Sequence, residues 1–377
     1  MSNNFIKHIT LENYKSIQKL DLELKPLNVL IGSNGAGKSN FISFFNLILK
    51  SLNGTAKAYI IKQGGMDYLL YYGVKYSELI SSTILLEDFG LEIKIQVTND
   101  LMMPYIHHRY IDTKQLNMPI VIKDQQRDQY SKFVMDIINP SREQFEFHRF
   151  LDNIIRDEPS NYSIIKSSIQ TFHFNDTSDT SPLKSTVANN DNLFLRADGQ
   201  NLSCMIKLIY DKHPDYYRMI VDTIRNVVPD FHEFVIRQNS DFLTLEWFNK
   251  NNVDIPWKAH YLSDGSLRFI ALAVLLLMPS ELQPQVIIID EPEIGLHPTA
   301  INVLSGLIKR ASLERQVIIS TQSAELLSQF EPNDVIVVDK KGKSSEFKRL
   351  NNADLAKWLE DYTLGELWET NIIGGRP

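Results

Sequence analysis

The sequence predicts an α/β fold built on a mixed, largely parallel sheet, with an antiparallel β flank and an inserted helical lobe. Continuous apolar runs at 27–31, 286–289 and 317–320 are typical of strands that are buried on both faces, as in a parallel sheet. The first run leads through a glycine-rich turn into residues 38–52, where apolar side chains recur with helical spacing. Residues 91–97 alternate between apolar and polar, which indicates an antiparallel flank.

The remaining elements follow from the same patterns. Residues 20–24 alternate like a strand that precedes the first buried run. Residues 124–166 are rich in charges and amides and are interrupted by prolines, which predicts helices of a separate lobe. The turn-prone stretch 172–192 predicts a loop. Helical spacing returns at 202–228, and alternation at 231–257 predicts further strands.

Composition limits the class of protein. Hydrophobic residues make up 43% and charged residues 23% of the 377 residues, as expected of a soluble globular protein. The longest apolar run, 269–278, is half of the roughly 20 residues that a membrane helix needs, and the first residues lack the apolar block of a signal peptide. Cys204 is the only cysteine, so an internal disulfide is excluded. We therefore expect a cytoplasmic protein.

The charge pattern argues against nucleic-acid binding by the chain as a whole. The net charge is −7, with 39 Lys and Arg against 46 Asp and Glu. This balance does not exclude a local basic groove. The densest basic cluster is Lys340, Lys341 and Lys343 around Gly342. It follows a strand-like run at 335–338, so we interpret it as a solvated hairpin turn.

The glycine-rich turn at 32–39, GSNGAGKS, fits the pattern G-x-x-x-x-G-K-[ST] of a P-loop. Its glycines let backbone N–H groups turn inward around phosphate oxygens, and the helix that follows adds a favourable dipole. Lys38 can reach the β and γ phosphates, and the Ser39 hydroxyl can bind Mg²⁺. We therefore predict that ATP contacts the following residues: Asn34, Gly35, Gly37, Lys38, Ser39 and Asn40.

Two carboxylates follow the apolar run 286–289. We predict that Asp290 holds Mg²⁺ and that Glu291 orients or deprotonates the attacking water. Acidic residues commonly end buried strands, so the P-loop is what favours the catalytic interpretation.

A third motif, LSDGS at 262–266, is close to the LSGGQ signature of ABC proteins and precedes an apolar helix pattern. The Ser263 hydroxyl, the Gly265 amide and the helix start could together bind an anion, but the chain already has a P-loop for its own nucleotide. We therefore expect Ser263 and Gly265 to complete the ATP site of a second copy. The alternative is an ordinary helix cap.

These motifs carry a resemblance to a known family. Residues 9–16, 32–39, 261–268 and 290–298 resemble RecF-like and OLD-like AAA ATPases, within the ABC-type RecF/SMC/OLD group, whereas the middle of the chain matches only loosely. The resemblance implies two heads that meet head to tail and enclose two ATP molecules. We expect the chain to be divided into a composite ABC-type nucleotide-binding lobe, made of 1–115 and 261–345, and two other segments. The other expected segments are an inserted, mainly helical lobe at 116–260 and a C-terminal helical tail at 346–377.

One departure concerns the switch histidine that many ABC proteins carry after the next strand. Here Gln322 takes that place, and it can hydrogen-bond a γ-phosphate but cannot carry positive charge. We expect Gln322 to take part in catalysis and turnover to be slow. Gln63 and Gln170 are both candidates for the glutamine loop of such proteins, and their spacing does not decide between them.

The leading functional hypothesis is an ATPase that dimerises on ATP and controls a partner effector. The resembling family includes ATPases of bacterial anti-phage systems that are paired with nuclease or Toprim proteins, so the resemblance implies such a partner. The alternatives are an ATP-gated scaffold with little turnover that holds a nuclease or toxin, and a RecF-like DNA repair ATPase.

Overall fold

The computed structural model describes residues 5–87, 89–98, 104–112 and 168–376 of the chain. The helices expected at 124–166 lie outside the described residues. Within the described ranges, no helix combines the length and the apolar character that a bilayer crossing needs.

The central sheet has six strands in the order β16-β15-β3-β14-β13-β7. All neighbours pair in parallel except β15 and β16, which form an antiparallel hairpin around Gly342, as the sequence predicts. Every residue of β3 and β14 is buried, which explains their continuous apolar sequence. The strands are β3 (Leu27–Ile31), β7 (Ile169–Phe172), β13 (Val286–Asp290), β14 (Gln316–Thr321), β15 (Val335–Lys341) and β16 (Ser344–Arg349).

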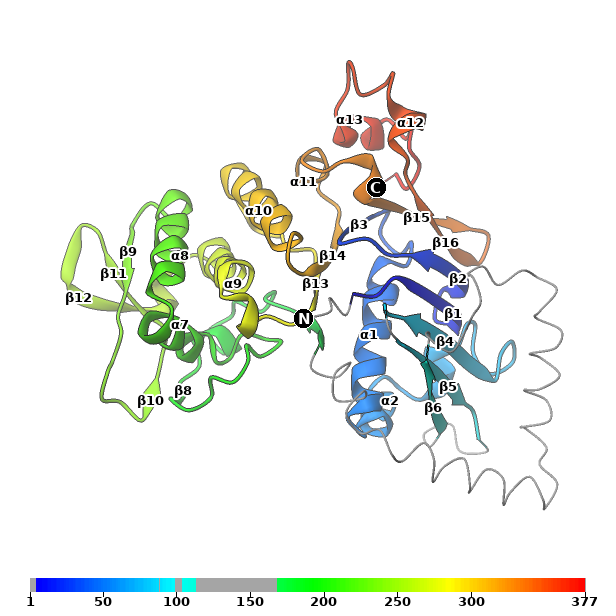
Figure 1. The fold of residues 1–377 in the computed structure, drawn as a ribbon, viewed down its shortest axis with the longest axis horizontal. Helices are drawn as coiled ribbons and strands as arrows, with labels where there is room; N and C mark the ends of the chain where they lie inside the picture. Colours follow the sequence, from blue (N-terminus) through cyan, green and yellow to red (C-terminus); the bar gives the residue numbers. More distant parts are fainter. Residues whose placement is uncertain (1–4, 88, 99–103, 113–167, 377) are drawn as a thin grey trace.

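An antiparallel sheet of five strands, in the order β2-β1-β4-β5-β6, forms the predicted flank. Helix α1 (Lys38–Leu52) lies beside this sheet (Figure 1). One hydrophobic cluster joins the aromatic residues of α1, among them Phe41 and Phe45, to both sheets, which fixes the start of α1 at the end of β3. The strands are β1 (His8–Tyr14), β2 (Ile17–Glu23), β4 (Leu79–Leu85), β5 (Phe89–Gln96) and β6 (Tyr105–Asp112).

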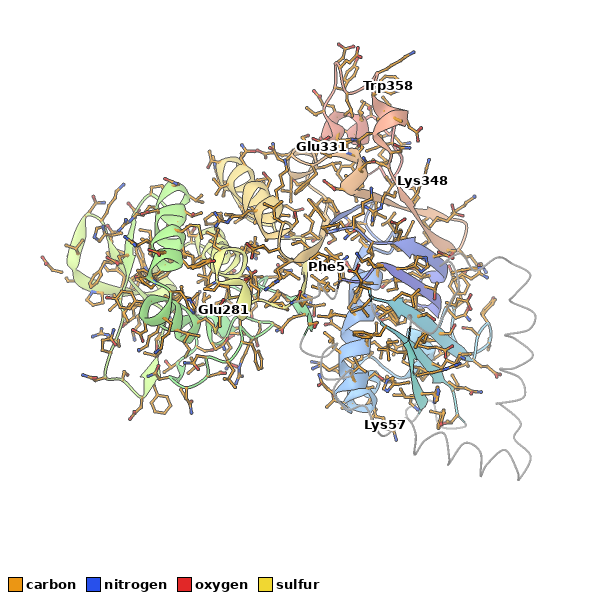
Figure 2. All side chains as sticks on the ribbon, in the orientation of Figure 1. Phe5, Lys57, Glu281, Glu331, Lys348 and Trp358 are labelled. Carbon is orange, nitrogen blue, oxygen red and sulfur yellow. The ribbon has the colours of Figure 1, made fainter. Side chains whose placement is uncertain are left out.

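A second lobe packs on the other side of the central sheet (Figure 1). Its helix α9 (Asp264–Leu277) is buried from Leu267 onward, as expected of a helix that is apolar all round. Figure 2 shows Glu281, just after α9, far from Lys57 on helix α2 (Ala56–Lys62) beside the antiparallel sheet. The other α-helices and strands of this second lobe are α7 (Leu202–Lys212), α8 (Pro214–Val227), α10 (Pro298–Ala311), β8 (Val187–Ala188), β9 (Phe231–Phe234), β10 (Phe242–Leu243), β11 (Glu246–Asn249) and β12 (Asn252–Lys258).

The predicted lobe boundaries remain a prediction, but two elements bear on them. Strand β7 lies within 116–260 and pairs with β13 of the central sheet. Strand β16 continues the sheet to Arg349, beyond the predicted boundary at 345. The short helices α12 (Asn352–Leu355) and α13 (Leu364–Glu369) follow it. The chain end returns to the sheet, where the backbone N–H of Gly375 donates to both carboxylate oxygens of Asp339 on β15.

Candidate functional site

The loop at 32–39 forms a turn around the start of α1. Gly35 and Gly37 have φ values of 76° and 124°, a region that disfavours side chains. Helix α1 begins at Lys38 without a side-chain cap, so the N–H groups of its first turn have no side-chain acceptor there. A helix start of this kind binds anions through its N–H groups and its dipole. The geometry therefore suits phosphate.

Lys38 is buried, and its Nζ donates to the carbonyl oxygens of Gly32 at 2.6 Å and Ser33 at 3.2 Å. Burial lowers the pKa of Lys38, while the carboxylates of Glu291, Asp290 and Glu293 raise it. The ammonium and these acids thus share one region. The structure reaches this arrangement because β3, β14 and β13 are parallel neighbours whose carboxyl ends meet.

Asp290 ends β13 opposite Ser320 of β14, and the Ser320 hydroxyl donates a hydrogen bond to its carboxylate. Ser39 is exposed at the start of α1. An exposed serine hydroxyl and a carboxylate fit Mg²⁺, which binds through few side chains and keeps several waters.

Glu291 has φ 49°, an uncommon conformation for a residue with a side chain. Its backbone N–H donates to the carbonyl oxygen of Ser320 at 3.1 Å. Its side-chain Oε1 accepts a hydrogen bond from the Gln322 amide. Strained backbone of this kind persists only where the surrounding structure holds it. It is concentrated at functional sites.

Glu293 is a member of the site that the sequence did not reveal. It is buried, and its Oε1 accepts from the Thr321 hydroxyl at 2.5 Å and from the backbone N–H of Gln322 at 3.0 Å. Its Oε2 is buried without a hydrogen-bond partner among the described residues. Burial raises the pKa of Glu293. Nothing in the sequence separates this glutamate from an exposed one, because its burial depends on how β14 lies beside the turn.

Two further segments support the loop from the opposite side. Asn40 donates from Nδ2 to Ser16 Oγ at 2.7 Å, in the turn between β1 and β2. Ser345 of β16 donates from its hydroxyl to the carbonyl oxygen of Ala36, and its Oγ lies 2.7 Å from Ser16 Oγ. A Cβ on Gly37 would lie 2.3 Å from Ser345 Oγ, which explains the glycine. Asn40 therefore braces the loop through its side chain.

Ser263 is the N-cap of α9, as in the alternative interpretation, and its Oγ accepts from the backbone N–H of Ser266 at 3.2 Å. A Cβ on Gly265 would lie 2.3 Å from the carbonyl oxygen of Gly295, in the turn after β13. The described hydrogen bonds join neither Ser263 nor Gly265 to residues 32–39. Figure 1 shows α9 on the far side of β13 and β14 from α1. The loop at 262–266 is thus separate from the P-loop of its own chain.

Arg268 anchors α9. Its guanidinium is buried and donates to the carbonyl oxygens of Phe174 at 3.1 Å, Asn175 at 3.0 Å, and Ile294. The start of α9 is therefore attached to the segments that follow β7 and β13. The turn after β13 is thus in contact with the first turn of α9, through Arg268 and Gly265.

Neither candidate for the glutamine loop reaches this site. Gln63 is the C-cap of α2, and Gln170 donates from its amide to the carbonyl oxygen of Leu195 at 3.1 Å. Instead, His173 follows Phe172, which pairs with Ile289, so its position lies beside that of Asp290. Burial lowers the pKa of His173, and the Asp290 carboxylate opposes that effect. His173 lies directly after strand β7, and that position could have indicated a site residue. However, β7 has only four residues, too few for its apolar pattern to be recognised in the sequence.

The comparisons with known proteins can now be set beside this geometry. Residues 111–328 match the family model described as "AAA domain, putative AbiEii toxin, Type IV TA system", and residues 5–192 match "AAA ATPase domain".

Among solved structures, the chain is similar to heads of SMC proteins. One, bound to the C-winged helix domain of ScpA, is 15% identical with a TM-score of 0.58, over 94% of this chain and 99% of that one. A Pyrococcus furiosus Smc head bound to the C-terminal domain of ScpA is 15% identical with a TM-score of 0.54, over 95% and 99%. A Pyrococcus yayanosii Smc head is 13% identical with a TM-score of 0.52, over 95% and 99%.

At these identities the SMC structures show the fold alone, and they confirm the predicted fold class. The first family model spans more than half of the chain and shows the family. Its match and the P-loop at 32–39 agree with the RecF/SMC-like resemblance drawn from the sequence. The chain therefore belongs to the AAA-domain family that the first model describes, carries a match to an AAA ATPase domain over residues 5–192, and has the fold of an SMC head.

Proposed function

We propose that this chain binds ATP with Mg²⁺ at residues 32–39, hydrolyses it, and dimerises head to tail on the nucleotide. The observation that carries the proposal is the meeting of Lys38, Asp290, Glu291 and Gln322 at one edge of the central sheet. Lys38 would contact the β and γ phosphates, and Ser39 and Asp290 would hold Mg²⁺. When bound, Mg²⁺ would offset the negative charge of the phosphates.

The catalytic roles follow from chemistry at the γ-phosphate. Glu291 would orient or deprotonate the attacking water, and Gln322 would hydrogen-bond the γ-phosphate. The contact between Gln322 and Glu291 supports both roles, because it places the two side chains within reach of the same reacting group.

The dimer is supported by the loop at 262–266. Ser263 and Gly265 make no described hydrogen bond to the P-loop of their own chain, although a serine cap at a helix start can bind an anion. In a head-to-tail dimer, each loop would complete the ATP site of the other copy. ATP would then stabilise the dimer in proportion to its preference for that state, and hydrolysis would release it.

Control of a separately encoded effector, such as a nuclease or a Toprim-like protein, belongs to the same proposal. It is supported by the family description, which names a toxin–antitoxin system. Anti-phage defence in the cytoplasm is the biological role that we propose.

A second candidate function, an ATP-gated scaffold with little turnover, is favoured by one observation. The side-chain amide of Gln322 donates a hydrogen bond to the Glu291 carboxylate, and glutamine cannot become cationic as a switch histidine can. In that case the chain would hold its partner while ATP is bound and would act through occupancy.

The test combines turnover with assembly. We expect wild-type protein to release phosphate from ATP, and Glu291→Gln to lower that rate by about 10²- to 10⁴-fold while accumulating an ATP-bound dimer in light scattering. A mixture of Lys38→Ala and Ser263→Arg chains adds a sharper arm, since only the mixed dimer holds one intact composite site and should recover part of the activity. Phosphate release without any dimer would contradict the composite site, and absent wild-type turnover would favour the scaffold.

A further inference from the structure

An exposed cluster of Tyr72, Tyr76 and Lys343, here called the tyrosine–lysine cluster, lies outside the residues that contact phosphate. Tyr72 is 43% and Tyr76 65% exposed, and their ring centroids are 5.8 Å apart. Lys343 Nζ lies 5.2 Å from the Tyr72 centroid and 5.5 Å from that of Tyr76. Rings and a cation that stay exposed together form a surface suited to a flat, anionic ligand.

Both halves of the cluster are linked to segments that contact the P-loop, namely β16 and the β1–β2 turn. Lys343 lies in the β15–β16 turn, two residues before Ser345, whose hydroxyl donates to the Ala36 carbonyl oxygen. On the other half, the backbone N–H of Tyr71 donates to the Asn13 carbonyl oxygen at 3.1 Å, next to the β1–β2 turn. That turn holds Ser16, which contacts Asn40 and Ser345.

The strand order gives a nucleotide on the P-loop a direction. Lys38, which reaches the γ end of a triphosphate, lies close enough to Asp290 and Glu291, at the carboxyl end of β13, for their carboxylates to raise its pKa. Strands β13 and β14 lie on one side of β3, and β15 and β16 lie on the other. A triphosphate that lies across the loop with its γ end toward β13 therefore directs its nucleoside toward β15 and β16, where Lys343 is.

We propose that the tyrosine–lysine cluster receives the nucleoside of the nucleotide held by the P-loop, with the base stacked on the ring of Tyr72. This inference rests on the proposed function and extends it to a second subsite. The base replaces the Lys343 ammonium on the ring, and the flexible lysine turns toward the α-phosphate. The rings of Tyr71 and Tyr76 contact the Tyr72 ring edge to face and thereby restrict its orientation.

The backbone of Tyr72 supports this role. Its φ is 52°, in the left-handed region that a residue with a bulky side chain rarely adopts. Such strain persists only where surrounding contacts hold it, and it is concentrated at ligand sites. Because every base has a π face, the stacking would strengthen binding without selecting adenine.

The test compares the binding of MgATP with that of inorganic triphosphate and Mg²⁺, which lacks the nucleoside. By calorimetry, Tyr72→Ala should weaken ATP binding about tenfold and leave triphosphate binding unchanged, because stacking on an aromatic ring is lost. Tyr72→Phe should bind ATP like the wild type. Tyr105→Ala, which removes an exposed tyrosine from β6, is the matched control and should change neither affinity.

The outcomes separate this inference from the function on which it rests. Equal ATP affinity in wild type and Tyr72→Ala, or an equal loss for ATP and triphosphate, would overturn the nucleoside subsite while the P-loop assignment stands. If Tyr72→Ala instead loses only the binding of a single-stranded oligonucleotide, the cluster is a nucleic-acid surface and the proposal is wrong. Wild-type protein that binds neither ATP nor triphosphate would remove the proposed function itself, and this inference with it.

Discussion

The side-chain amide of Gln322 donates a hydrogen bond to Oε1 of Glu291 across the carboxyl ends of two parallel strands. The residue proposed to contact the γ-phosphate thus also contacts the residue proposed to act on water. The contact uses one of the two carboxylate oxygens of Glu291. We therefore expect contact of Gln322 with the γ-phosphate to be coupled to the position of the Glu291 carboxylate.

If that coupling operates, Gln322→Ala should lower the rate of phosphate release by about 10- to 100-fold, since a hydrogen bond to a charged group contributes about 1.5 to 3 kcal/mol. The affinity for ATP should change much less, because Lys38 and the loop amides remain. Single-turnover kinetics with labelled ATP would measure both quantities. Gln329→Ala, a partly buried glutamine nearby, serves as the control, and a loss confined to ATP affinity would contradict the assigned role.

Lys38→Met tests the P-loop without adding a cavity. Burial disfavours the Lys38 ammonium and lowers its pKa, so an apolar side chain of similar volume should leave the apparent stability unchanged or raise it. In thermal melts, ATP at about 100 times its dissociation constant should stabilise the wild type by about 2.7 kcal/mol. The variant should show no such shift. A full ATP-dependent shift in Lys38→Met would exclude the assignment.

Gly265→Ala tests the contact between the start of α9 and the turn after β13. The added Cβ would lie 2.3 Å from the carbonyl oxygen of Gly295, so we expect a loss of about 1 to 3 kcal/mol in the free energy of unfolding. ATP-dependent dimerisation should weaken as well. Gly306→Ala on α10 is the control, because its Cβ would meet nothing within 4 Å and should stabilise by about 0.5 to 1 kcal/mol. Equal denaturation midpoints for the two variants would contradict this packing.

Glu293 should make stability depend on pH. Burial raises the pKa of its carboxyl above the ordinary value of 4.5, so the neutral form is the one that favours folding. The contribution is complete below the ordinary value and is lost as pH rises through the pKa of the folded state.

Glu293→Gln should therefore lose less stability than the wild type between pH 4.5 and neutral pH, because the amide stays neutral and keeps an acceptor for Thr321 and Gln322. Urea denaturation at several pH values would measure the difference. Identical pH profiles for the two proteins would show that Glu293 is charged or exposed in solution.

Much of the fold was predictable because its signals are local. The buried strands β3, β13 and β14 and the helix α1 lie where the apolar runs and the helical spacing predict them. The prediction for 202–228 was less complete, since the single helical pattern corresponds to two helices, α7 and α8, that meet at His213. Strand β7 was not predicted: it lies between the expected helices at 124–166 and the expected loop at 172–192, and its four residues carry too little periodicity to be recognised.

The candidate site divides in the same way. Lys38, Asp290 and Glu291 could be proposed from the sequence because each stands at a fixed place in a short motif. Glu293, Ser16, Ser345 and His173 could not, because their importance depends on neighbours more than 25 residues away in the sequence.

The sequence alone determined the glycine-rich turn before α1, the acidic end of β13 and a helix start near Ser263, since backbone conformation and strand burial follow from residues close together in the chain. Only the tertiary structure decided that β14 lies between β3 and β13, which brings Gln322 to Glu291 and buries Glu293. It also placed the β15–β16 turn on the opposite side of the loop, beside Tyr72. Strand order is set by the packing of distant apolar faces against α1 and α9, and no local pattern encodes it.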